Sequence, residues 1–319
     1  MNIDHVNFTR AASLPVIEQL NDVAPDAFIG YYKENEGEIE KKLLEAGVIK
    51  FKGVRIGSVE DFQKIVDSIS SEFLQYIDGN SPRKKLSGNV YTSTEYNQAL
   101  RITMHNELSY SAKWPNKLFF SCIQPATTGG ETLIADSRDI LEKMNRDIVS
   151  EIAERGITYI RNLHAGRGIG PSWQDTFETA DKDQLEEYCN SYAIDFEWGR
   201  KDSLRLKHST KGIIQHRVTK EMVWFNQIDQ FHPCHLGEEM FEVVQLLYDT
   251  PEEFPMYVRF GDGKEISESI VREILRTIEE VTIAPVWQTN ELLILDNELV
   301  SHGRNSYTGN RKVLVSMSA

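Results

Sequence analysis

The sequence predicts a mainly β protein with helical insertions, and a double-sheet jelly roll fits it best. Short, mostly apolar runs bounded by turn residues are typical of strands, and they recur from residue 90 almost to the last residue. They do not alternate strictly with helical segments, which argues against a doubly wound parallel sheet. The predicted strands are 90–92, 101–104, 118–123, 132–135, 157–161, 212–214, 222–225, 292–296 and 312–317.

Helices are predicted before and between these strands. The best specified begins with Ser58 and Asp61, which form an S-x-x-D capping box ahead of apolar residues at helical spacing as far as Phe73. A longer helix is expected to begin with Asp136 or Ser137 as its cap. The predicted helices span about 36–46, 58–73, 137–155, 181–192 and 267–281.

Composition and charge set the broad class. The 319 residues suffice for one large domain or two small ones. There are 35 Lys and Arg against 49 Asp and Glu, a net charge of −14. This charge disfavours nucleic acid and anionic membranes as partners, because their phosphates would be repelled. A small-molecule substrate is compatible with it, since a pocket can carry the opposite sign.

The cysteines and the first residues indicate a cytoplasmic protein. Cys122, Cys189 and Cys234 are odd in number and lack C-x-x-C spacing, so we expect no disulfide framework. The opening MNIDHVNFTRAASLP lacks the charged-then-apolar pattern of a signal peptide. No run of 18 apolar residues occurs, so no membrane-spanning segment is expected.

A candidate metal site begins with His105-Asn106-Glu107, directly after the predicted strand 101–104. Residues i and i+2 of a strand share a face, so His105 and Glu107 can converge while Asn106 faces away. An imidazole and a carboxylate on one face make two thirds of a facial triad. By itself the triplet is weak evidence, because a surface histidine beside a solvated glutamate is the alternative.

His302 is the best candidate for the third ligand. It lies in LLILDNELVSHGRNSYTG, in an expected loop after an apolar strand, where functional residues often lie. Two histidines and one carboxylate leave three positions open on an iron ion. A bidentate 2-oxo acid and O2 require that number of positions.

These residues belong to a larger set through which the chain resembles the taurine dioxygenase family (TauD/TfdA). Within that family it resembles the branch of clavaminate-synthase-like and SyrP-like hydroxylases. The matching stretches cover about two thirds of the chain, from about residue 88 onward. They are VYTSTEYN, HNELSY, GGETLIADSR, the segment around WQDTFET, VWFNQ and DNELVSHGRNSYTGNRKVLVSM.

The resemblance implies a double-stranded β-helix that uses iron(II), 2-oxoglutarate and O2. It implies one domain over residues 1–319, with a helical N-terminal part at about 1–80 and a helical insertion at about 137–200. It carries over His105, Glu107 and His302 as iron ligands. Thr132 would contact a carboxylate of 2-oxoglutarate, and Arg311 would hold its far carboxylate.

Two features of this set need comment. Lys312 is an alternative to Arg311; since both lie in a predicted strand, only one of them can point inward. Glu107 stands where much of the family has aspartate, but the clavaminate-synthase-like branch has glutamate. Related halogenases have a small residue there, which leaves room for chloride. Glu107 therefore indicates hydroxylation rather than halogenation.

Other residues have two interpretations each. Asn226 in VWFNQ could contact substrate or form a turn, and Arg304 in HGR could face the substrate or form a structural ion pair. The segment 232–235 (HPCH) contains three potential ligands, but it lacks a second pair at zinc-finger spacing, so we expect a loop. Gly129-Gly130 has no phosphate-binding motif around it, and a tight turn is expected.

The resemblance implies an oxygenase that couples the decarboxylation of 2-oxoglutarate, to succinate and CO2, with attack on an unactivated C–H bond. By analogy with the branch, the substrate would be an amino acid or a small derivative, free or carrier-bound, in natural-product biosynthesis. Desaturation or cyclisation is the alternative reaction. A non-catalytic binding protein on this fold and a zinc hydrolase are the alternatives of other classes.

Overall fold

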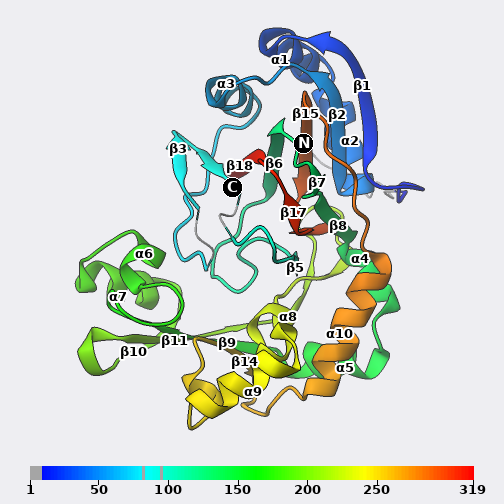
Figure 1. The fold of residues 1–319 in the computed structure, drawn as a ribbon. Coiled ribbons are helices and arrows are strands. Elements are labelled where there is room, and N and C mark those ends of the chain that lie inside the picture. Colours follow the sequence, from blue (N-terminus) through cyan, green and yellow to red (C-terminus); the bar gives the residue numbers. More distant parts are fainter. Residues whose placement is uncertain (1–8, 81–82, 94–95) are drawn as a thin grey trace.

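The computed structural model describes residues 9–80, 83–93 and 96–319 (Figure 1). Within these ranges it is a mixed protein with many strands and ten α-helices. No helix in the described part of the chain is both long and apolar enough to cross a membrane.

A seven-stranded sheet forms the main scaffold. The two strands at one edge of this sheet, Val16–Val23 and Val48–Val54, are parallel, and all other neighbouring strands are antiparallel. In spatial order the strands are β1 (Val16–Val23), β2 (Val48–Val54), β15 (Glu291–Asp296), β6 (Lys117–Gln124), β18 (Lys312–Ser318), β4 (Val90–Thr92) and β3 (Lys85–Ser87).

The two faces of this sheet pack against different partners. Side chains alternate along a strand, so Phe119 of β6 faces one way while Leu118 and Phe120 face the other. Phe119 joins a cluster built largely from the first helices, whereas Leu118 and Phe120 join the main core. The helices on the outer face are α1 (Pro25–Glu34), α2 (Glu36–Ala46) and α3 (Val59–Ile69).

A three-stranded antiparallel sheet lies against the inner face. Its order is β5 (Ile102–His105), β16 (Val300–Arg304) and β8 (Thr132–Asp136). The ring of Phe120 on β6 lies 5.4 Å from the ring of His302 on β16, centre to centre, so the two sheets meet there. A small ladder, β7 (Thr128–Gly129) with β17 (Tyr307–Thr308), closes one end.

Most of the remaining elements lie to one side of these two sheets, in the lower half of Figure 1. A four-stranded antiparallel sheet has the order β10 (Asp195–Trp198), β11 (Leu204–Thr210), β9 (Ile157–Leu163) and β14 (Met256–Phe260), and β12 (Ile213–Gln215) pairs with β13 (Met222–Trp224). The other helices are α4 (Ser137–Lys143), α5 (Arg146–Arg155), α6 (Trp173–Phe177), α7 (Lys182–Ser191), α8 (Ile228–Phe231), α9 (Glu238–Leu247) and α10 (Glu268–Val281). Short 3-10 helices are η1 (Arg200–Asp202), η2 (Pro233–Leu236) and η3 (Pro251–Glu253).

Several local predictions are confirmed and others are wrong. Ser58 and Asp136 cap α3 and α4 as expected. The single helix expected over 137–155 is in fact two, because Met144 leaves the helical conformation and Asn145 caps α5 with its side chain. The part at 1–80, expected to be helical, also contributes β1 and β2 to the main sheet.

Candidate active site

The three predicted ligands come together through the register of two strands. In the pairing of β16 with β5, His302 lies directly opposite His105. His302 is therefore in a strand rather than in the loop expected from the sequence. Glu107 follows β5 by two residues, and its carboxylate lies 3.5 Å from Nε2 of His302. One potential ligand atom from each of the three residues lies within 4.8 Å of the others.

The position of Glu107 is determined by the turn between β15 and β16. The side-chain oxygen of Asn297 accepts a hydrogen bond from the backbone N–H of Glu107 at 2.7 Å, and its Nδ2 donates to the carbonyl of Glu107 at 3.0 Å. Asn106 points away, as predicted, and donates to the carbonyl of Asn297 and to Ser137. The turn that precedes His302 thus also orients Glu107.

The electrostatics of the three side chains suit a divalent cation. Burial, with the facing imidazole of His302, lowers the pKa of His105 to about 3, so its ring is neutral and can donate a lone pair. Burial acts to raise the pKa of Glu107, but Arg83 and the two imidazoles hold it well below its usual range. A neutral histidine and an ionised carboxylate are the forms that bind a metal.

Two further observations fit a metal at this point. Nδ1 of His105 lies 2.9 Å from the carbonyl oxygen of Thr103, which leaves Nε2 available for coordination. On His302 it is Nε2 that faces the Glu107 carboxylate, as coordination through that nitrogen requires. Two histidines and one carboxylate form the ligand set of non-haem iron(II) oxygenases.

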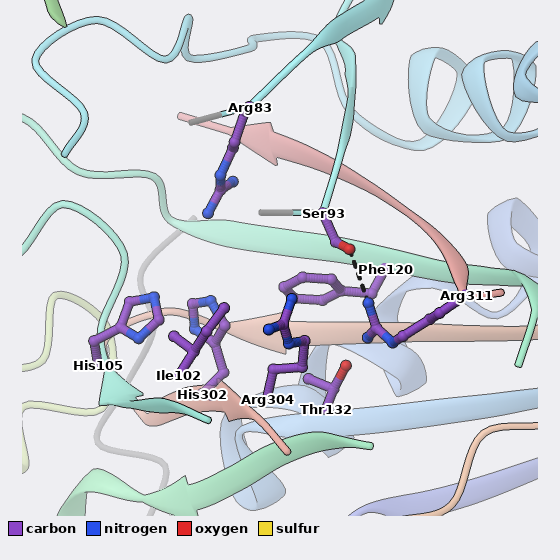
Figure 2. Close-up of a pocket in the computed structure, with 10 residues that line it drawn as sticks. Arg83, Ser93, Ile102, His105, Phe120, Thr132, His302, Arg304 and Arg311 are labelled. Carbon is purple, nitrogen blue, oxygen red and sulfur yellow. Dashed lines mark hydrogen bonds between the residues drawn. The ribbon is translucent and has the colours of Figure 1, made fainter. Parts of the chain in front are cut away.

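Thr132 and Arg311 lie toward the other end of the same cavity (Figure 2). Thr132 pairs with Arg304 across β8 and β16, two residues from the pairing position of His302. Arg311 donates from Nε to the carbonyl of Gly130 at 2.8 Å and from NH1 to the hydroxyl of Ser93 at 2.9 Å. Burial and the nearby Arg304 lower the pKa of Arg311 to about 10, so an anion beside it would be stabilised.

The structure also distinguishes between the interpretations that the sequence left open for three positions near the cavity. Lys312 is exposed, whereas Arg311 lines the cavity. Arg304 lines it too, but its guanidinium donates to the backbone carbonyls of Asn97 and Leu100. Asn226 is buried and bonds to Gly212 and to the N–H of Ile228, which supports turn formation.

The Gly129-Gly130 pair and the segment 232–235 (HPCH) both take part in ordinary backbone structure. Gly129 and Gly130 have φ of 67° and 75°, but Gly129 belongs to strand β7 and pairs with Tyr307, so the tight turn expected there is replaced by a strand end. His232 accepts a hydrogen bond from the N–H of Cys234. Within the described ranges, His105, Glu107 and His302 are the only group of three or more residues placed to hold a metal.

Sequence reasoning missed several residues at the cavity. Arg83, Ile102 and Phe120 line it, and no motif pointed to them. Trp287, expected to be an ordinary core aromatic, donates from its indole N–H to the hydroxyl of Thr132 at 2.9 Å. Asn297 lay within a quoted motif, but the sequence gives no sign that its side chain binds the backbone of Glu107.

Known proteins resemble this chain over nearly its whole length. The family described as "Taurine catabolism dioxygenase TauD, TfdA family" matches residues 14–317. The dapdiamide synthesis protein DdaC of Enterobacter agglomerans is 34% identical, with 98% of this chain and 91% of that protein covered. A clavaminate synthase-like protein of Arabidopsis thaliana is 29% identical over 89% of this chain and 85% of its own.

Solved structures share the fold at low identity. AAD-2 in complex with Mn(II) and N-oxalylglycine superposes with a TM-score of 0.56 at 12% identity, over 97% of this chain and 96% of that one. A taurine dioxygenase from Burkholderia xenovorans gives a TM-score of 0.53 at 14% identity, over 97% of this chain and 89% of that one. At such identities the likeness concerns the fold.

Together, the fold and the His-Glu-His site define an iron(II)- and 2-oxoglutarate-dependent oxygenase that acts with O2 on a small molecule. Within that class, the chain belongs to the TauD/TfdA family of dioxygenases.

Proposed function

We propose that the protein hydroxylates an unactivated C–H bond of an amino acid or a small amino-acid derivative, with release of succinate and CO2. The observation that carries the proposal is the convergence of His105, Glu107 and His302 at one end of a cavity that holds Thr132 and Arg311. The same oxidant could desaturate or cyclise the substrate, and product analysis distinguishes these reactions.

In this proposal His105, Glu107 and His302 hold the iron ion. Iron(II), when bound, supplies the activation of O2, with 2-oxoglutarate as the source of two electrons. The protein contributes the geometry of its ligands. The hydrogen bond from His105 to Thr103 sets its ring, and Asn297 sets the backbone of Glu107.

Arg311 and Thr132 hold 2-oxoglutarate. The Arg311 guanidinium would pair with the far carboxylate, and it keeps its charge when buried. Thr132 accepts from Trp287, so its own hydroxyl proton is free to donate to a carboxylate oxygen. Phe120 and Ile102 also line the cavity and present apolar surface to it.

The biosynthetic role rests on similarity. The relative at 34% identity is named for the synthesis of dapdiamide, which supports a role in natural-product biosynthesis. We further propose that residues 1–319 form one domain on a double-stranded β-helix, with the two facing sheets as its halves. The presence of all five expected site residues argues against a non-catalytic binding protein.

Anaerobic spectroscopy tests the metal and 2-oxoglutarate assignment. Addition of iron(II) and 2-oxoglutarate should produce a weak visible charge-transfer band in the wild-type protein and none in His105→Ala. His164→Ala, a histidine outside the site, is the matched control and should keep the band. A wild type without the band, or a His105→Ala variant that retains it, would refute the ligand set.

The reaction is tested separately. With O2 present, an amino-acid panel should contain a compound that accelerates succinate release and gains one oxygen atom. If succinate release were unaffected by every amino acid tested, the proposed substrate class would be wrong while the cofactor assignment could still stand.

A further inference from the structure

Arg83 is a buried cation in the cavity that none of the sequence motifs explains. Its side chain is 3% exposed, and NH2 donates to Oε2 of Glu107 at 2.5 Å. Its guanidinium lies over the ring of Tyr76, 4.4 Å from the centre. Figure 2 shows Arg83 reaching toward His105 and His302, well away from Arg311 at the other end of the cavity.

The guanidinium of Arg83 has N–H donors that no described residue fully uses. An arginine side chain offers five N–H donors. NH2 binds Glu107, and the one contact of NH1 with the described residues is a weak one with the sulfur of Met317 at 3.9 Å. Nε is buried and has no partner among the described residues. A buried donor without a partner is unfavourable, so a ligand that supplies an acceptor is favoured.

The balance of charges in the cavity also favours a negatively charged ligand beside Arg83. Once the proposed cofactors bind, the charges of iron(II) and Arg311 balance those of Glu107 and 2-oxoglutarate. Arg304 also lines the cavity, but backbone carbonyls already solvate its guanidinium. Apart from Glu107, which contacts Arg83 and His302, no carboxylate lies at the cavity within the described residues. Among the described residues Arg83 is then paired only with Glu107, whose negative charge the metal would share, so a further negative charge beside Arg83 would be favourable.

We propose that Arg83 binds a free carboxylate of the substrate beside the metal. The inference rests on the function proposed above and narrows its substrate class. A carboxylate provides the two acceptor oxygens that a guanidinium binds in parallel, and it supplies the missing negative charge. Arg83 and Arg311 would thus divide the cavity into a substrate end and a 2-oxoglutarate end.

This assignment has two consequences for the substrate. Arg83 is bonded to a metal ligand, so a carboxylate held by it lies close to the metal, and the oxidised carbon must be near that carboxylate rather than at the far end of a long chain. An amino acid tethered to a carrier through its α-carboxyl has lost that charge in the thioester. We therefore infer that the substrate carries a free carboxylate, which a carrier-bound amino acid retains only where its side chain supplies one.

Paired ligands test the proposal without any mutation. The protein is loaded with Mn(II) and N-oxalylglycine, a non-reacting analogue of 2-oxoglutarate, and thermal unfolding is followed with a panel of L-amino acids and their carboxamides. At least one amino acid should bind about tenfold or more tightly than its carboxamide, as expected for a charge-assisted bond. A wild type that shows no such preference for any pair overturns the proposal.

Variants then locate the effect. Arg83→Met should reduce the carboxylate preference by about tenfold, and Arg83→Lys should retain part of it, while Arg167→Met, at an exposed arginine, should retain all of it. Arg83→Met should keep the anaerobic iron(II)–2-oxoglutarate band. Loss of the band in a folded Arg83→Met protein would mean that Arg83 acts on Glu107 instead, and would overturn the proposal. Absence of the band in wild type would refute the proposed function itself.

Discussion

At the scale of single residues, the choice between Arg311 and Lys312 has a direct consequence. Arg311→Met should raise the KM for 2-oxoglutarate by about one to two orders of magnitude, because a buried charge-assisted pair is lost. Lys312→Met should change it by no more than about twofold, since Lys312 is exposed. Steady-state succinate release measures both values. The opposite ranking would assign the co-substrate to Lys312.

Trp287 offers a second test at this scale, because it acts through Thr132. Trp287→Phe keeps an aromatic ring but removes the N–H that donates to the Thr132 hydroxyl. Without this donor, the Thr132 hydroxyl is no longer held in the orientation that directs its proton toward 2-oxoglutarate. We expect a KM for 2-oxoglutarate about fivefold higher, the worth of one hydrogen bond, with kcat nearly unchanged.

Trp198→Phe is the matched control for that experiment. It removes an indole N–H that donates to Glu186, on the part of the molecule that carries α7 and β10. Its KM for 2-oxoglutarate should equal that of the wild type. If Trp287→Phe behaved in the same way, Thr132 would not depend on Trp287 for its orientation.

At the scale of elements, the close approach of β5 and β16 brings the two histidines together. Gly303 lies between His302 and Arg304, and a Cβ added there would lie 2.7 Å from the backbone oxygen of Ile102. Because that atom is backbone, Gly303→Ala must push the strands apart. We expect iron(II) affinity to fall at least tenfold although no ligand is removed, as measured by metal titration.

The control for Gly303→Ala is Gly37→Ala. Gly37 is exposed in α2, and an added Cβ there meets no atom within 4 Å. Alanine should stabilise this helix by about 0.5–1 kcal/mol and leave metal affinity unchanged. Equal metal affinity in both variants would show that the β5–β16 spacing does not control the site.

The elements also show what the sequence could and could not predict. Local signals were sufficient for α3, where Ser58 caps the helix, and for the strand that ends in His105. The break at Met144 was missed because apolar residues continue at helical spacing across it. The strand β2 was missed although Ile49, Lys50, Phe51 and Lys52 alternate between apolar and polar residues, as strands often do.

At the scale of the whole molecule, the candidate site is assembled from segments far apart in the chain. The predicted ligands were recognisable because each lies in a motif with its own residue pattern. Arg83, Asn297 and Trp287 were not recognisable in this way, since their roles depend on contacts with residues 24, 190 and 155 positions away. Such contacts follow from the folded arrangement and leave no local pattern.

The pH dependence of stability is a property of the whole molecule to which Asp229 should contribute. Asp229 is 1% exposed, and no side chain in the described part of the chain donates to its carboxylate. Burial raises its pKa to about 7, opposed only by nearby backbone N–H groups. In the unfolded chain an aspartate ionises near pH 4.

The sign of the effect follows from proton binding. Between about pH 4 and pH 7 the folded protein retains a proton on Asp229 that the unfolded chain has lost, so the free energy of unfolding falls as pH rises. The contribution is full below about pH 4 and is lost by about pH 8. A pKa difference of this size corresponds to a loss of up to about 4 kcal/mol.

Asp229→Asn should therefore remove this pH dependence, because asparagine does not ionise. In urea unfolding of the metal-free protein, the stability of Asp229→Asn relative to wild type should rise by up to about 4 kcal/mol between pH 4 and pH 8. Asp249→Asn, at an exposed aspartate, should show a much smaller change over the same range. A difference between Asp229→Asn and wild type that is the same at every pH would mean that the buried carboxyl group ionises normally in the fold.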